Sequence, residues 1–214
     1  MTLNRYDASG LAEGQFEPGS NDLVLRNLRG ITDPAEMDRV EAAELAATLD
    51  GLVHQFDVDH RFTARDICAM HLRWLGGTYQ WAGRYRQVNL FKSGFPFAAA
   101  SQVERLMAGF EEAVLNRNTP CRFDDLNDVV RALAEVHVEL VLIHPFRDGN
   151  GRIARVLAIL MALQAGLPVL QFRSMTGGRR EDYFAAVQAG INGDYLPMKR
   201  AFARVVSATL VGGR

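Results

Sequence analysis

Cysteine is scarce in this chain of 214 residues, where only Cys68 and Cys121 occur, far apart and without the spacing of a metal site. Two isolated cysteines of this kind predict reduced thiols, and therefore a cytoplasmic protein. The N-terminus lacks the apolar core of a signal peptide, and no apolar run is long enough to span a bilayer, so we expect no membrane association. The net charge of -1 excludes a global basic field, and we expect no direct binding to nucleic acid.

β-Strand signals are also scarce, and the sequence predicts a mainly α fold in one domain. The best strand candidate is "YRQVNLFKSGFPFAA" (85–99), in which a turn at Ser93 and Gly94 predicts a short hairpin. Residues 1–31 hold several glycines and a proline among polar residues, and predict an irregular N-terminal arm on a helical domain of residues 32–210.

Helix signals fill most of the remaining chain. Thr32 or Asp33 is expected to cap a first helix, Thr63 a second that ends at Leu75, and Ser101, in the capping-box pattern "SQVE", a third to about residue 115. A long helix is predicted to begin near residues 123–125 and to end near 143, and another to run from about 152 to 165. Two more are expected at 180–191 and 196–210.

The loop between the two central helices, "IHPFRDGNGRIAR" (143–155), concentrates residues that chemistry uses. His144 directly follows an apolar helix that Pro145 cannot continue, so its position is fixed. A histidine is most often structural, but a fixed imidazole with a pKa near neutrality can also serve as a general base. Phe146 is expected to turn into the core and anchor the loop.

The second half of the loop has the features of an anion site. Gly149 and Gly151 flank the start of a helix, whose N–H groups and dipole attract a phosphate. Asp148 offers an oxygen ligand for Mg²⁺, although it could equally cap the helix. Arg152 and Arg155 lie three residues apart, on neighbouring parts of the helix surface, and can hold further phosphate oxygens. Together these residues indicate phosphoryl or nucleotidyl transfer from a magnesium nucleotide.

The segment "HPFRDGNGRIAR" resembles the signature of the Fic family (filamentation induced by cAMP), HxFx[D/E]GNGRxxR, at every specified position. "WAGRYRQVNL" with "FPFAA" is similar to the region of the family's β-hairpin flap, and "EPGSNDLVLRNLRGI" to the arm of its short, toxin-like members. The resemblance implies a helical bundle around the motif loop, and a protein adenylyltransferase that moves AMP from ATP to a hydroxyl side chain of a target protein.

The resemblance also implies a role for each matching residue. His144 would be the catalytic base and Asp148 the ligand of Mg²⁺. The nucleotide would be bound by the rest of the motif and by one tyrosine beyond it: Phe146, Gly149, Asn150, Gly151, Arg152, Arg155 and Tyr183. The flap would hold the target as an added strand, through Asn89, Leu90, Phe91, Lys92, Ser93, Gly94, Phe95, Pro96 and Phe97.

The sequence leaves alternatives open for how the protein is inhibited and for which reaction it catalyses. Fic enzymes are commonly silenced by an inhibitory helix of the form [S/T]xxxE[G/N], and "SGLAEG" (9–14) matches it, with Ser9 as the first position and Glu13 as the candidate partner of Arg155. Because Gly10 and Gly14 disfavour a helix, inhibition by a separate small antitoxin protein is preferred. The fold could instead transfer UMP, GMP or phosphocholine, remove AMP, or only bind nucleotide. A kinase is disfavoured because Doc-type kinases carry alanine and lysine where this chain has Gly149 and Gly151.

Overall fold

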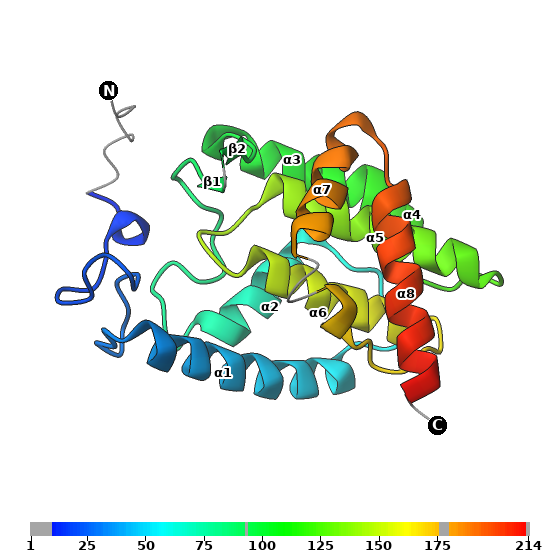
Figure 1. Cartoon of the computed structure of the whole chain (residues 1–214), viewed down its shortest axis with the longest axis horizontal. Coiled ribbons are helices and arrows are strands. Elements are labelled where there is room, and N and C mark those ends of the chain that lie inside the picture. The colour runs from blue at the N-terminus through cyan, green and yellow to red at the C-terminus, as the bar shows by residue number, and fades with distance from the viewer. Residues whose placement is uncertain (1–9, 93, 176–179, 213–214) are drawn as a thin grey trace.

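Helices make up most of the computed structural model, which describes residues 10–92, 94–175 and 180–212 (Figure 1). The mainly α prediction is confirmed. The α-helices are α1 (Pro34–Gln55), α2 (Ala64–Leu75), α3 (Val103–Phe110), α4 (Asn116–Asn118), α5 (Leu126–Ile143), α6 (Asn150–Gln164), α7 (Arg180–Ala189) and α8 (Leu196–Gly212). Within the described ranges, no helix is long and apolar enough to cross a membrane.

Two helix starts have a cap that the sequence predicts, and a third is capped within the range predicted for its start. Asp33 accepts a hydrogen bond from the Ala35 N–H at the start of α1, and Asp125 does the same for Asn127 at the start of α5. Thr63 and Asp66 form a reciprocal capping box at α2. The predicted cap at Ser101 is wrong, because Ser101 lies inside a short 3₁₀ turn, Ala100–Gln102, that runs directly into α3. A helical turn can thus replace a side-chain cap.

Helices α5 and α6 form the centre of the molecule. Along α5 the buried side chains cover nearly the whole circumference, which allows the helix to pack against α3, α6, α7 and α8 at once. Helix α6 is similarly buried and packs on α1 and α2. The six residues between these two helices are the motif loop, 144–149. Both of its ends are therefore held by helices that cannot shift without disturbing the core.

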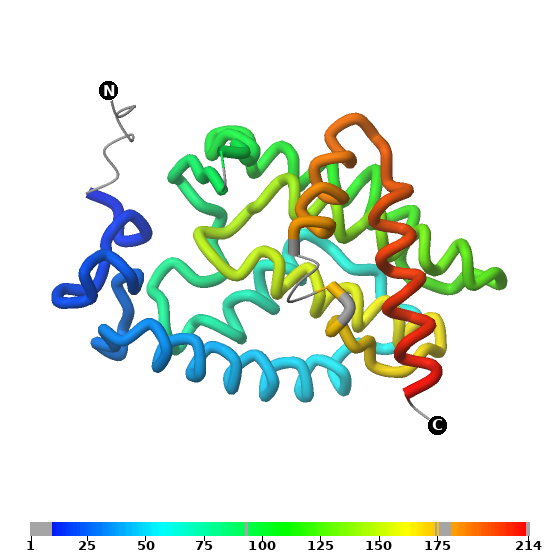
Figure 2. The backbone as a smooth tube through the Cα atoms, in the orientation of Figure 1, coloured from blue at the N-terminus to red at the C-terminus, as the bar shows by residue number. Residues whose placement is uncertain are grey.

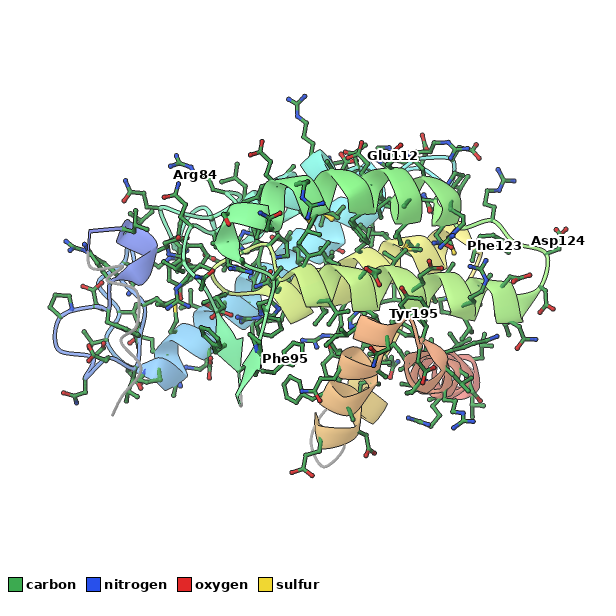
Figure 3. The ribbon with its side chains drawn as sticks, turned by 90° about the horizontal axis from the view of Figure 1, so that it is seen from above. Arg84, Phe95, Glu112, Phe123, Asp124 and Tyr195 are labelled. Atoms are coloured by element: carbon green, nitrogen blue, oxygen red, sulfur yellow. The ribbon has the colours of Figure 1, made fainter. Side chains whose placement is uncertain are left out.

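A two-stranded hairpin projects beside the motif loop. Strand β1 (Phe91–Lys92) pairs antiparallel with β2 (Phe95–Pro96), and Gly94 takes the left-handed conformation, with φ of 78°, that a tight turn needs. The predicted hairpin is confirmed, with strands that are shorter than the pattern suggested. Ser93 lies outside the described residues. Figure 3 shows the hairpin with Phe95 on the side of α5 where α7 lies.

The described part of the N-terminal arm, residues 10–31, lies at the end of the molecule opposite α8 (Figure 2). It contains a 3₁₀ turn, Ala12–Gly14, and a single bridge between Phe16 and Leu25. The Leu28 N–H donates to the Thr78 carbonyl at 2.8 Å, and Arg29 pairs with Glu44 of α1. The arm is thus attached to the helical part by hydrogen bonds at more than one point.

Candidate active site

His144 is the C-cap of α5 and has a left-handed backbone, with φ of 53° and ψ of 58°. This conformation is uncommon for a residue other than glycine, and here it turns the chain sharply into Pro145. The imidazole Nδ1 lies 2.9 Å from the Val141 carbonyl oxygen. Because a carbonyl can only accept, Nδ1 carries the proton, and Nε2 is left with its lone pair. That is the tautomer a general base at Nε2 requires.

Burial lowers the pKa of His144 to about 4, and the cations of Arg86 and Lys92 lower it further, while the Val141 hydrogen bond and Asp148 oppose the shift. The imidazole is therefore neutral at physiological pH. The Phe97 ring stacks on it, with centroids 3.6 Å apart and an angle of 15° between the planes. A flap residue thus covers one face of the imidazole and helps to exclude water from it.

The start of α6 depends on a glycine and an asparagine. Gly149 is the N-cap, with φ of 80°, and a Cβ atom there would lie 2.7 Å from Cζ3 of Trp74. The Asn150 side chain is buried, accepts from the Phe146 N–H and donates to the Phe146 carbonyl, both at 2.8 Å. Asn150 is one of the residues predicted to bind the nucleotide, and in this structure its amide closes the motif loop on itself and so sets the loop's shape.

Asp148 has no capping role at α6, because Gly149 occupies that position. Its carboxylate accepts from the Gly149 N–H at 2.5 Å, and half of the side chain is exposed. Among the described residues, no group of three or more His, Cys, Asp or Glu side chains could hold a metal ion. A single accessible carboxylate fits Mg²⁺, which protein sites commonly bind through one or two carboxylates plus substrate phosphates and water.

Arg152 is held by α1, which the sequence did not predict. Its guanidinium pairs with the buried carboxylate of Glu41, lies 3.4 Å from Asp148 and sits over the Trp74 ring. Glu41 also accepts a hydrogen bond from the Tyr79 hydroxyl at 2.6 Å. Glutamate in an amphipathic helix usually faces water, so nothing in its local pattern distinguishes Glu41.

Arg155 is a partly buried cation of the site. Burial lowers its pKa, and no carboxylate in the described part of the chain pairs with its guanidinium. Tyr183 opposes this shift, and its hydroxyl lies 2.9 Å from Nε2 of His137. His137 is buried in the core, where burial and the nearby Arg155 lower its pKa to about 3. A partly buried guanidinium without a carboxylate partner calls for an anion from outside the chain.

These side chains meet at one cavity of about 730 Å³, between the flap, the motif loop and α7. The predicted site residues that line it are His144, Asp148, Gly149, Asn150, Gly151, Arg152, Arg155 and Tyr183, with Lys92, Phe95 and Phe97 from the flap. Across the cavity, the Lys92 ammonium lies 4.8 Å from the ring centroid of Phe184, on α7. The volume is sufficient for a nucleotide-sized ligand.

The remaining predicted residues lie away from the cavity. Phe146 is fully buried and stacks on His71 at 3.9 Å, so it anchors the loop and cannot touch a ligand in the cavity. Asn89 accepts from the Ala100 N–H, at the base of the flap. The described flap residues that do not line the cavity are Asn89, Leu90, Phe91, Gly94 and Pro96, of which Phe91 is the most exposed large apolar side chain.

The candidate contact between Glu13 and Arg155, which the sequence disfavours, is not formed in this structure. The Glu13 carboxylate accepts from the Gln87 N–H at 2.6 Å, and the Glu13 carbonyl accepts from Nε of Arg147 at 2.7 Å. The segment forms only the 3₁₀ turn Ala12–Gly14, because its glycines do not support an α-helix. Ser9, the first position of the proposed inhibitory motif, lies outside the described residues.

The chain is similar in sequence to known proteins. A model of the Fic/DOC family matches residues 61–162. Over 193 residues the chain is 32% identical to protein adenylyltransferase VbhT of Bartonella schoenbuchensis, covering 85% of this chain and 38% of that protein. Over 195 residues it is 29% identical to the probable protein adenylyltransferase Fic of Escherichia coli, covering 87% and 86%.

Solved structures share the fold. BepC of Bartonella tribocorum, crystallised with bound AMPPNP, superposes with a TM-score of 0.72 at 23% sequence identity, covering 90% of this chain and 96% of that one. The chain spans between a quarter and two fifths of the length of the first curated relatives that it matches. The likeness in structure therefore extends over nearly the whole chain, while the longer relatives contain further sequence.

Proposed function

The chain belongs to the Fic/DOC family, and from this premise we propose that it is a protein adenylyltransferase that moves AMP from ATP to a hydroxyl side chain of another protein. One observation carries the proposal: a neutral imidazole, a helix N-terminus and a partly buried guanidinium without a carboxylate partner face the same cavity. A base, a phosphate site and a counter-charge are what nucleotidyl transfer needs. Residues 32–210 would form the catalytic domain and residues 1–31 an arm on it.

In this reaction Nε2 of His144 takes the proton of the target hydroxyl, whose oxygen attacks the α-phosphorus of ATP as the bond to pyrophosphate breaks. The first N–H groups of α6, at Asn150 and Gly151, have no partner within the helix and would face the α-phosphate. Arg152 and Arg155 would hold the β- and γ-phosphates. Asp148 would hold Mg²⁺, which when bound neutralises charge on the leaving phosphates.

The flap is proposed to dock the target. Phe91 and Lys92 are exposed, while Phe97 reaches from the other side of the hairpin to His144. An extended segment of the target added along the hairpin would therefore pass close to the base. The unpaired cysteines, Cys68 and Cys121, support a cytoplasmic place of action.

Inhibition is proposed to come from a separate small antitoxin protein. Arg155 has no carboxylate partner within the described ranges, and Glu13 is engaged at the base of the flap. A carboxylate brought by another protein could occupy the γ-phosphate position and block productive ATP binding. The isolated chain would then be active without removal of any of its own residues.

Labelled ATP tests the proposed function. Purified chain with Mg²⁺ and cell lysate should transfer label to protein from ATP labelled at the α-phosphorus, and none from ATP labelled at the γ-phosphorus. Transfer from the γ-position would indicate a kinase, and transfer from neither would indicate a nucleotide-binding module. Mass spectrometry of the labelled proteins, with His144→Ala beside the wild type, would identify the target residue and confirm that the chain makes the modification.

A further inference from the structure

Arg86 is a buried arginine, 2% exposed, whose guanidinium is surrounded by main-chain carbonyls. Nε donates to the His144 carbonyl at 2.6 Å, and one terminal nitrogen donates to Val88 at 2.7 Å. The other donates to Ala98 at 2.5 Å and to Ile143 at 3.3 Å. The Arg86 backbone N–H adds a bond to the Pro145 carbonyl at 2.9 Å. One side chain thus contacts the chain where it enters the flap, where it leaves the flap, and at the turn that carries the base.

This arrangement links two parts of the site through one rigid group. A guanidinium is planar and directs its N–H groups in fixed directions, so it holds several acceptors in one relative geometry. Val88 and Ala98 lie on the two sides of the hairpin, while Ile143 and His144 form the left-handed turn. If the flap moved relative to this turn, at least one of these hydrogen bonds would break.

A buried cation that contacts only carbonyls needs an anion nearby, and Glu13 supplies it. Burial lowers the pKa of Arg86 to about 10, and the Glu13 carboxylate opposes that shift. Glu13 is itself 7% exposed, and it bonds to Gln87, the residue next to Arg86, and to Arg147 in the motif loop. It therefore joins the arm to the same two segments that Arg86 joins to each other.

We propose that Glu13 and Arg86 are positioning residues, which form a buried brace that fixes the base of the flap against the turn carrying His144. The inference rests on the proposed function, since the brace would set the distance between a target hydroxyl on the flap and Nε2 of His144. It gives Glu13 a supporting role, opposite in sign to that of an inhibitory residue. ATP would bind at the start of α6, so the loss of the Glu13 carboxylate should not affect ATP binding directly.

Glu13→Ala and Glu13→Gln separate the two roles. Alanine removes the acceptor for the Gln87 N–H, whereas glutamine keeps an oxygen in its place. Glu135→Ala is a matched control, because it also removes a buried carboxylate, whose partners Arg117, Asn118 and Arg131 lie outside the flap and the motif loop. Each purified variant would be assayed for label transferred from α-labelled ATP to lysate protein, for ATP binding by calorimetry, and for hydrogen exchange in peptides from 85–92 and 140–150.

The brace predicts that Glu13→Ala lowers the transfer rate about tenfold, because misplacing reacting groups by ~1 Å can cost ~10²-fold. ATP affinity should change less than about twofold, and both peptides should exchange faster. Glu13→Gln should restore most of the rate and of the protection, and Glu135→Ala should leave both peptides unchanged. Unchanged or higher transfer by Glu13→Ala would overturn the brace, as would unchanged exchange in both peptides. Hydrogen exchange does not depend on transfer activity. It therefore tests whether the brace holds the flap against the His144 turn even if the wild-type protein adenylylates no target.

Discussion

The neutrality of the His144 imidazole comes from its place in the fold. With a pKa lowered to about 4 by burial, the base stays unprotonated through the neutral range. A base is competent above its own pKa, so the transfer rate should stay nearly flat from about pH 8 to about pH 6 and fall only as the pH approaches the lowered pKa. Rates of α-label transfer measured across this range would check the shift. A fall centred near the ordinary histidine value of 6.5 would contradict it.

His144→Ala should abolish most of the transfer and leave ATP binding nearly intact. General bases contribute about 10²–10⁴-fold, and the Nε2 atom faces the target hydroxyl and not the phosphates. Label transfer and calorimetric ATP binding, measured on the same preparation, would show the split. Equal transfer by mutant and wild type would remove His144 from its role as base.

Arg155 is expected to weaken the fold slightly and to strengthen ATP binding. A partly buried cation without a carboxylate partner costs stability, so Arg155→Ala should leave the free energy of unfolding unchanged or raise it. The same substitution should weaken ATP binding, because a charge-assisted hydrogen bond to a phosphate is lost. Unfolding by denaturant measures the change in the free energy of unfolding, and calorimetry measures the change in ATP affinity. Normal ATP affinity together with normal turnover would exclude Arg155 from the site.

Among the elements, the start of α6 is the most constrained by packing. Gly149→Ala meets two costs: the strain of a left-handed alanine, about 1 kcal/mol, and a contact with the buried Trp74 ring. We expect a loss of ~2–4 kcal/mol in the free energy of unfolding, with weaker ATP binding. Gly166→Ala is the control, because Gly166 has φ of 74° and nothing within 4 Å of its Cβ position. Equal losses in the two variants would show that the ring contact contributes nothing.

Sequence reasoning located those elements whose signals are local. Asp33, Thr63 and Asp125 cap their helices through residues two or three positions away, so the pattern contains the cause. Ser101 carried the same pattern and failed, because a preceding 3₁₀ turn makes the cap unnecessary. The elements were therefore predictable where the stabilising contact spans a few residues, and less so where one helical turn leads directly into another.

The site was predictable in its motif and not in its supports. The residues from His144 to Arg155 are contiguous, and the structure brings most of them to one cavity. Glu41 is 111 residues from its partner Arg152, and Glu13 is 74 residues from Gln87. No local spacing encodes such contacts. Glu13 shows the opposite error, since a short pattern named the residue and offered Arg155 as its partner, whereas its carboxylate bonds to the Gln87 N–H and acts on Arg86.

Across the whole molecule, two buried histidines, His71 and His137, and the partly buried His144 couple stability to pH. Burial lowers the pKa of His71 and His144 to about 4 and that of His137 to about 3, from an ordinary value of 6.5. Below pH 6.5 the unfolded chain therefore binds more protons than the folded one, and stability falls as the pH falls from about 6.5 toward about 4. Each histidine should cost roughly 1 kcal/mol between pH 7 and pH 5.5.

Urea unfolding at several pH values would measure this coupling. The slope of the unfolding free energy between pH 6 and pH 5 reports the number of protons taken up. His71→Gln should reduce that slope by about one proton, even if the loss of its bonds to Gly83 and Asp148 lowers stability overall. An unchanged slope would show that His71 titrates alike in both states.

The Arg86 side chain has a consequence for how such a protein can evolve. The Arg86 guanidinium donates to four main-chain carbonyl oxygens, those of Val88, Ala98, Ile143 and His144. Every amino acid has a main-chain carbonyl, so these hydrogen bonds do not depend on which side chains the four residues carry. Mutation can therefore change the side chains of the flap while the hydrogen bonds from Arg86 continue to connect the flap to the turn that carries His144. The preference for one target over another can therefore change between lineages with little effect on the chemical step. Target preference depends on the side-chain atoms of the flap, whereas the position of His144 depends on main-chain atoms.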